Sequence, residues 1–230
     1  MPLQWIRPPR QVRTQESLER LLDAAQHLLG DKRFEDVHVA EVARLANTSV
    51  ASFYRRFPDK DALLHALHER LCEEAFATAE DALAPARWEA AGIAEILSEI
   101  FPFLVDVLKR HEALDRAIYQ RAMSDELMHE RASRLTRYVV QGLSQLLVAR
   151  SQEITHPTPK LAISFALVQA LALLVQHYTV GFREIELVHP CDEELARQLT
   201  ASCLAYLGVC NPSNDLDSRK ERPNEAFHPS

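Results

Sequence analysis

The stretch from Leu161 to Val175 restricts the fold of this chain most strongly, because only Ser164 and Gln169 within it are polar. It is shorter than the roughly 20 apolar residues that a bilayer span requires, so no membrane is expected as a partner. A helix that is apolar on nearly every side must instead be buried on nearly every side. One face can pack on its own domain, and the opposite face then needs a second protein chain.

We therefore predict a homodimer that is formed by a helix over residues 159–182 and a helix over residues 192–207. A homodimer of this kind normally has two-fold symmetry, so both copies contribute the same surface. Leucines recur on the second helix, at Leu195, Leu199, Leu204 and Leu207.

The rest of the sequence also favours helices. Glycine is scarce, with 5 residues in 230, and leucine, alanine, glutamate and arginine recur between separated prolines. These residues have high helix propensity, whereas strands would need frequent glycine-rich turns. We expect an all-α fold, with helices over residues 92–109, 112–123 and 125–150 besides the two at 159–182 and 192–207.

The N-terminal part predicts three short helices and the start of a long one. Apolar residues at helical spacing indicate a helix over residues 14–29 and a second one over residues 39–46. Ser49 is placed to cap a third helix that ends at Arg56, and Asp59 is placed to cap the long helix.

Charge is distributed unevenly along the chain. The net charge of −7 divides into +1 for residues 1–71 and −8 for the remainder. Residues 1–13 carry Arg7, Arg10 and Arg13 without any acidic residue, and two prolines oppose a helix there. We predict a flexible basic arm over residues 1–13. The distribution keeps nucleic acid possible as a partner in spite of the acidic total.

The most specific pattern lies between residues 39 and 63. A small residue lets one helix approach the next, a serine caps the second helix, two aromatic residues flank a basic pair, and a lysine opens the helix that follows. In that order they are Ala43, Ser49, Tyr54 and Phe57 around Arg55 and Arg56, and Lys60. The pattern resembles the signature of the tetracycline-repressor (TetR) family of transcriptional regulators, and the resemblance covers residues 14–64.

This resemblance implies two domains. An N-terminal helix-turn-helix domain with three helices would occupy residues 14–60, and a larger helical domain for ligand binding and dimerisation would occupy residues 61–210. Residues 211–230 are polar and contain prolines, so we predict a disordered tail there.

The resemblance also implies which residues bind double-stranded DNA. Val50 and Ala51 would meet base edges, where apolar side chains favour thymine methyl groups. Arg55 would reach a base or a phosphate, and Arg13 would enter an adjacent minor groove together with Arg7 and Arg10. The other predicted DNA-binding residues, which cap the recognition helix or hold phosphates, are Ser49, Ser52, Tyr54, Arg56 and Lys60. Phe57 is assigned to the core.

The sequence departs from the family pattern at three positions. Asn47 stands where the family usually has glycine, but asparagine also tolerates the left-handed conformation. Ala51 replaces another frequent glycine. His38 replaces the usual threonine and is expected to form an unusual capping box with Glu41. These differences concern which operator sequence is read.

The implied function is a ligand-responsive, cytoplasmic transcriptional regulator, expected to be a repressor that a small hydrophobic molecule releases from a pseudo-palindromic operator. The sequence has no apolar segment near Met1 that would serve as a signal peptide. Two alternatives remain open, namely a helical ligand-binding or scaffold protein that does not bind DNA, and an activator of the same family.

A pocket for the effector is expected in the C-terminal domain, among aromatic and polar residues on otherwise apolar helices. The candidates are Trp88, Phe101, Phe103, Tyr119, Gln120, Tyr138, Phe165, Gln169 and His177.

No enzymatic activity, cofactor or metal site is predicted, because no convergent set of reactive groups is visible. His65 and His68 have the spacing of a metal pair, but this spacing more often belongs to surface or packing residues. The cysteines are expected to be ordinary thiols, although Cys203 and Cys210 are spaced to share a helix face.

Overall fold

The computed structural model describes residues 12–180 and 191–210, and these residues form helices joined by short turns, with no strand among them. The predicted all-α fold class is therefore confirmed. The predicted arm residues Arg7 and Arg10 and the predicted tail over residues 211–230 lie outside the described residues.

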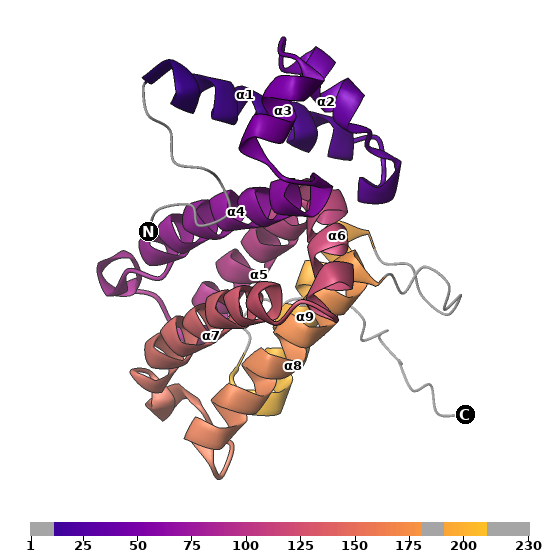
Figure 1. Cartoon of the computed structure of the whole chain (residues 1–230). Helices are drawn as coiled ribbons and strands as arrows, with labels where there is room; N and C mark the ends of the chain where they lie inside the picture. The colour runs from indigo at the N-terminus through magenta and orange to yellow at the C-terminus, as the bar shows by residue number, and fades with distance from the viewer. Residues whose placement is uncertain (1–11, 181–190, 211–230) are drawn as a thin grey trace, which may run out of the picture.

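The N-terminal helices follow the predicted order (Figure 1). They are α1 (Val12–Leu29), the short 3-10 helix η1 (Phe34–Asp36), α2 (Val39–Leu45), α3 (Val50–Arg56) and α4 (Lys60–Ala82). Because α1 begins at Val12, Arg13 belongs to its first turn and not to an extended arm. A proline restricts itself and the residue before it, so a helix can begin soon after Pro9.

The helices of the remaining chain agree with the predicted ranges within a few residues. They are η2 (Pro85–Trp88), α5 (Ile93–Arg110), α6 (Glu112–Ala122), α7 (Glu126–Val148), η3 (Ser151–Glu153), α8 (Pro159–Thr179) and α9 (Asp192–Leu207).

The first hydrophobic core joins α1, η1, α2 and α3 to the first half of α4. Phe53 and Phe57 are completely buried in it. Leu114 and Ile118 of α6 and Met128 of α7 pack into the same core. The first core therefore extends beyond the domain boundary predicted at residue 60, because α6 lies against α1 and α4 (Figure 1).

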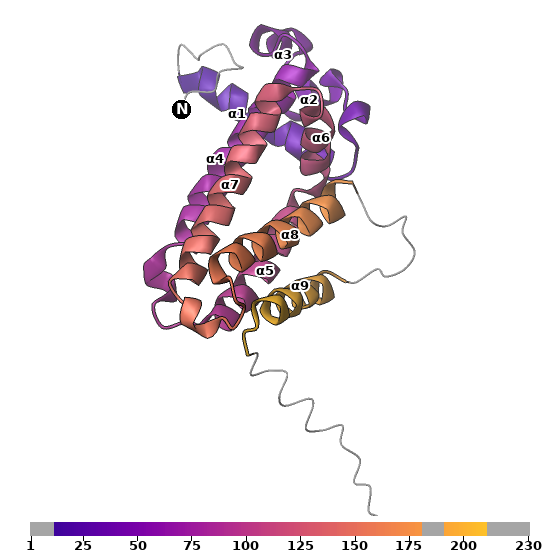
Figure 2. The ribbon, with the colours of Figure 1, turned by 90° about the horizontal axis from the view of Figure 1, so that it is seen from below.

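The second hydrophobic core is formed by α5, the C-terminal half of α7, α8 and α9. Leu97 and Phe101 of α5 and Leu174 of α8 are completely buried in it. α5 packs on α9, and α8 contacts both α7 and α9 (Figure 2). These helices make a bundle on the side of α4 opposite to α1–α3.

α8 has one buried face and one exposed face, and both are apolar. Ile163, Leu167 and Leu174 face the second core. Leu161, Phe165 and Val168 lie on the exposed face, and Val168 keeps 54% of its surface accessible. The prediction that its own domain would cover only one face of this helix is confirmed.

The length of α8 differs from the expectation. The helix has 21 residues and, by length and composition alone, could cross a membrane, as no other described helix could. The apolar stretch Leu161–Val175, which was predicted to be too short for a span, is the middle part of this longer helix. Its packing against α6, α7 and α9 is that of a core helix.

Two of the four cysteines are buried and two are exposed. Cys72 and Cys203 lie in the interior, where burial raises the pKa of each thiol to about 11, whereas Cys191 and Cys210 are exposed. α9 ends at Leu207, and Gly208 follows in the left-handed conformation with φ 67°. Cys210 therefore does not share a helix face with Cys203, which corrects that prediction.

Candidate nucleic-acid interface

α3 begins at a serine cap, as predicted. Ser49 Oγ accepts a hydrogen bond from the backbone N–H of Ser52 at 3.1 Å, and the two hydroxyl groups are 3.0 Å apart. Such a cap satisfies one of the backbone N–H groups that have no partner inside the helix. The cap at the N-terminus of α3 is therefore formed by neighbouring residues of the chain.

The turn between α2 and α3 depends on Asn47. Its φ of 51° makes it the only described non-glycine residue in the left-handed region. The following N–H, of Thr48, donates to the carbonyl oxygen of Ala43 at 2.9 Å, which closes the turn. The expectation that asparagine would tolerate this conformation is confirmed.

α2 is capped through Glu41. Its carboxylate accepts a hydrogen bond from the backbone N–H of His38 at 3.3 Å and forms an ion pair with Lys32 at 2.6 Å. The hydrogen bond from Lys32 is the main cause that lowers the pKa of Glu41. The capping box predicted for His38 and Glu41 is present.

α3 is supported by two phenylalanines. Phe53 and Phe57 are completely buried, with their ring centroids 5.2 Å apart. Tyr54 stands against Phe53 edge to face at 5.4 Å, but its side chain remains 51% exposed. Phe57 thus belongs to the core, as predicted, whereas Tyr54 is available to a partner.

The outer face of α3 carries apolar and basic side chains together. Val50, Ala51 and Arg55 are exposed. Arg55 Nη2 donates to Ser52 Oγ at 2.5 Å, which holds the guanidinium beside the helix N-terminus. Arg56 is half-buried, and the loss of solvent lowers its pKa. Ser49 and Tyr54 are exposed beside these side chains on the same short helix and its cap.

Lys60 lies differently from the expectation. Its ammonium donates to the carbonyl oxygens of Phe34, Glu35 and Val37 at 2.7, 3.0 and 3.2 Å, which occupies all three of its hydrogens. It also lies 4.6 Å from the centroid of the Phe34 ring. Lys60 therefore ties η1 to the start of α4, and its contact with a phosphate stays a prediction.

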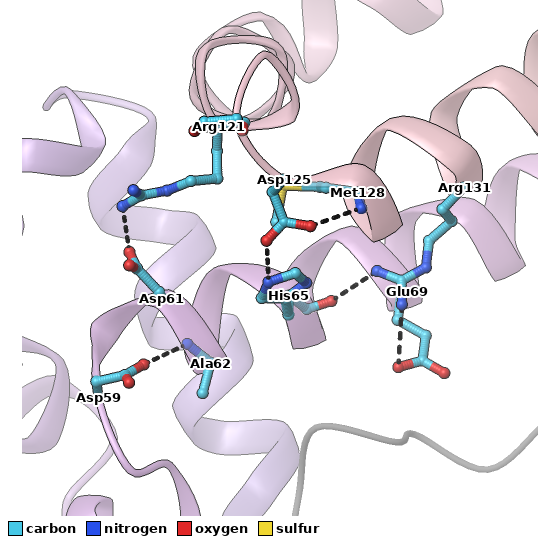
Figure 3. A network of polar contacts seen from close by, with 10 residues as sticks. Asp59, Asp61, Ala62, His65, Glu69, Arg121, Asp125, Met128 and Arg131 are labelled. Carbon is cyan, nitrogen blue, oxygen red and sulfur yellow. Dashed lines mark hydrogen bonds and ion pairs between the residues drawn. The ribbon is translucent and has the colours of Figure 1, made fainter.

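Figure 3 shows how α4 is joined to the helices behind it. Asp59 caps α4, because its carboxylate accepts the N–H of Ala62 at 2.7 Å. In the first turn of α4, Asp61 forms an ion pair with Arg121 at the end of α6. The first turn of α4 is thus fixed by its own cap and by an ion pair to the end of α6.

The histidines on α4 are buried packing residues. His65 Nε2 contacts a carboxylate oxygen of Asp125 at 2.9 Å. His68 is 2% exposed, and burial is the main cause that lowers its pKa to about 3. No group of side chains that could hold a metal ion occurs within residues 12–180 and 191–210. The packing role expected for His65 and His68 is confirmed.

Residues 21–67 match the sequence model of the bacterial regulatory proteins of the tetR family. This segment of the chain is similar to the N-terminal domain of the tetR family. The matched segment runs from the middle of α1 into α4 and includes α3 with its cap, its turn and its two supporting phenylalanines.

Solved structures of tetR-family proteins resemble this one over most of the chain. A transcriptional regulator of the family from Streptomyces coelicolor has a TM-score of 0.63 at 16% identity and covers 90% of this chain and 96% of its own. A protein from Mesorhizobium loti named for the same family has a TM-score of 0.64 at 19% identity and covers 86% of this chain and 98% of its own. A transcriptional regulator from Rhodococcus has a TM-score of 0.63 at 19% identity and covers 85% of this chain and 100% of its own. No protein of curated function matches the sequence.

The predicted effector-pocket residues have different environments in this fold. Trp88 and Phe101 are buried in the second core, and Trp88 donates its indole N–H to the carbonyl oxygen of Ala82 at 2.8 Å. Phe103, Tyr138, Phe165, Gln120 and Gln169 are exposed, and Tyr119 and His177 are half-buried. Gln120, Tyr138 and Gln169 line three separate depressions. These residues therefore do not share one environment.

Sequence reasoning overlooked two features of the tetR-type domain. Arg44 is exposed in the last turn of α2, directly before the turn that leads to α3. Its basic character next to the turn was a signal that could have identified it. The carbonyl contacts of Lys60 had no signal in the sequence, because η1 is 23 to 26 residues away along the chain.

Proposed function

We propose that this chain is a transcriptional regulator of the tetR family that binds a DNA operator as a dimer. The exposed face of α3 carries the proposal. Val50 and Tyr54 are 41% and 51% exposed, although their helix is fixed from behind by the buried Phe53 and Phe57. A rigid helix with exposed apolar and basic side chains fits the major groove of DNA, which admits one α-helix.

Different side chains of α3 would contact the bases and the phosphates of the operator. Val50 and Ala51 lie in the first turn and would meet base edges. Tyr54, Arg55 and Arg56 lie in the last turn and would hold phosphates, with Ser49 and Ser52 at the helix start. Arg44 at the end of α2 would add a further phosphate contact, because the first helix of such a motif crosses the DNA backbone.

The dimer would use the exposed face of α8 together with α9. Leu161, Phe165 and Val168 repeat at helical spacing on that face. Tyr206 of α9 extends it, with its ring centroid 5.7 Å from that of Phe165. A contiguous apolar surface of this kind marks an interface. A two-fold dimer would then present two α3 helices to the two halves of a pseudo-palindromic operator.

We further propose that the chain is a repressor that a small hydrophobic molecule releases from DNA. α4 supports this route, because it starts directly after α3 and continues along α7 (Figures 1 and 2). A ligand that prefers one position of α4 shifts the population of DNA-binding molecules toward or away from the operator.

Fluorescence anisotropy with the DNA upstream of its own gene tests DNA binding. Arg55→Ala should weaken binding to all DNA by about 1 to 2 kcal/mol and flatten the salt dependence, because a phosphate contact is lost. Arg110→Ala is the matched control, since Arg110 is exposed on α5 and pairs with Asp106. An unmodified protein that binds no DNA would instead favour the scaffold alternative. Transcription measured with and without the protein separates repressor from activator.

A further inference from the structure

α4 and α7 run side by side and in the same direction. The contacts between them advance together along both helices, from His65 and Asp125 through Phe76 and Tyr138 to the end of α4. At that end Gly142 approaches Leu83 so closely that a Cβ on Gly142 would lie 2.7 Å from Leu83 Cδ1. The two helices are thus joined tightly at both ends.

Between these two ends the helices leave a groove of about 470 Å³. It is lined by Phe76 of α4 and by one stripe of α7, which consists of Arg134, Arg137, Tyr138 and Gln141. The stripe has the i, i+3, i+4, i+7 spacing of a single helix face.

The two arginines of this groove have no acidic partner among residues 12–180 and 191–210. Neither Arg134 nor Arg137 forms an ion pair with any described residue, whereas Arg131, one turn earlier, pairs with Glu69 at 3.9 Å and donates to the carbonyl oxygen of His65 at 3.3 Å. A guanidinium without a carboxylate partner offers parallel N–H groups to an anion, and a carboxylate fits that fork.

The aromatic rings of the groove indicate the rest of the ligand. Phe76 and Tyr138 stand edge to face with their centroids 5.3 Å apart, and Arg134 lies 5.3 Å from the centroid of Phe76. Tyr138 remains 39% exposed, so a planar apolar group could cover it. Glu73 and Glu130 line the adjoining hollow, which Arg131 and Arg134 also line, and would repel an anion on that side of Arg134. The anionic group of a bound molecule would therefore lie toward Arg137.

We propose that this groove binds an aromatic carboxylate, with the carboxylate on Arg134 and Arg137 and the ring against Phe76 and Tyr138. The inference rests on the proposed function in one respect, namely that the bound molecule acts as an effector. One wall of the groove is α4, whose first turn follows α3, so a molecule between α4 and α7 acts on the helix that carries the DNA-binding domain.

Isothermal titration calorimetry of the full chain with naphthalene-1-carboxylate and with neutral naphthalene-1-carboxamide tests the site. The carboxylate should bind at least about tenfold more tightly, since hydrogen bonds to a charged group each contribute about 1.5 kcal/mol or more. Arg137→Gln should remove this preference. Arg110→Gln, an exposed arginine of α5 that pairs with Asp106, should keep it. Equal affinity for the two probes, no binding of the carboxylate, or an unchanged preference in Arg137→Gln would overturn the proposal.

Operator affinity measured with and without saturating carboxylate tests the effector role. A change in affinity that disappears in Arg137→Gln supports it, and an unchanged affinity overturns it. If the protein without ligand binds no DNA, the proposed function fails, but the calorimetric result for the groove is unaffected. The two failures are therefore distinguishable.

Discussion

His65 of α4 and Asp125 at the start of α7 are joined by a contact of 2.9 Å between Nε2 and a carboxylate oxygen (Figure 3). The other carboxylate oxygen of Asp125 accepts the backbone N–H of Met128 at 2.9 Å and so caps α7. One carboxylate therefore holds both the first turn of α7 and the helix that follows α3. Any movement of α4 along α7 has to break this contact.

Two substitutions of Asp125 separate its role as the cap of α7 from its contact with His65 of α4. Asp125→Ser keeps a cap acceptor but loses the partner of His65, so we expect a loss of about 1 to 2 kcal/mol in the free energy of unfolding. Asp125→Ala should lose about 1 kcal/mol more, because the cap is lost as well. Urea denaturation measures both. Asp59→Ser is the control, because exposed Asp59 caps α4 and should tolerate serine. A stability of Asp125→Ser equal to that of the unmodified protein would contradict the link.

Lys60→Met should destabilise the protein in the absence of DNA. The methionine keeps an apolar stem near Phe34 but removes three hydrogen bonds to carbonyl oxygens, so we expect a loss of about 1 to 3 kcal/mol. Thermal denaturation without DNA is the measurement. If the melting temperature were unchanged while DNA binding weakened and its salt dependence flattened, Lys60 would act through a phosphate instead.

Substitutions on the two faces of α8 should have opposite consequences. Val168 is 54% exposed, so Val168→Glu should leave the fold intact and produce monomers. Leu171 is 8% exposed and packs in the second core, so Leu171→Glu should unfold the domain by burying a charge. Sedimentation velocity and circular dichroism separate the two results. A stable monomer of the unmodified protein, or a dimeric Val168→Glu, would remove the proposed interface.

His68 should make stability depend on pH. Its pKa is about 3 in the folded protein against 6.5 in the unfolded chain. Below pH 6.5 the unfolded chain therefore gains a proton that the folded protein does not take up until about pH 3, and stability falls as the pH falls. The loss from this group is about 2 kcal/mol at pH 5.

His68→Leu isolates this contribution. Unfolding free energies of both proteins at pH 8 and pH 5 should show a smaller acid loss in the variant. Burial raises the pKa of Asp115 to about 7, so this group favours the folded state at low pH and opposes His68. The comparison with the variant at each pH cancels that opposing effect. If the free energies of unfolding of the two proteins differed by the same amount at pH 8 and at pH 5, the pH dependence could not be assigned to His68.

Local sequence was sufficient to predict the helices and the cap and turn that begin α3. Ser49 and Asp59 cap helices through atoms three residues away, and Asn47 forms its turn through its own φ. Such interactions involve neighbours in the chain, so residue type and spacing predict them. The same holds for the two apolar faces of α8, because helical periodicity places Ile163 and Val168 on different sides.

Only the tertiary structure decided how distant segments meet. It placed α6 in the first core, bound Lys60 to carbonyl groups of η1, and sent Phe101 inward while Phe103 stayed exposed. It also placed Phe76 beside Tyr138, which creates the groove between α4 and α7. These contacts join residues far apart in the sequence, and they depend on how whole helices pack, which no local pattern of residues specifies.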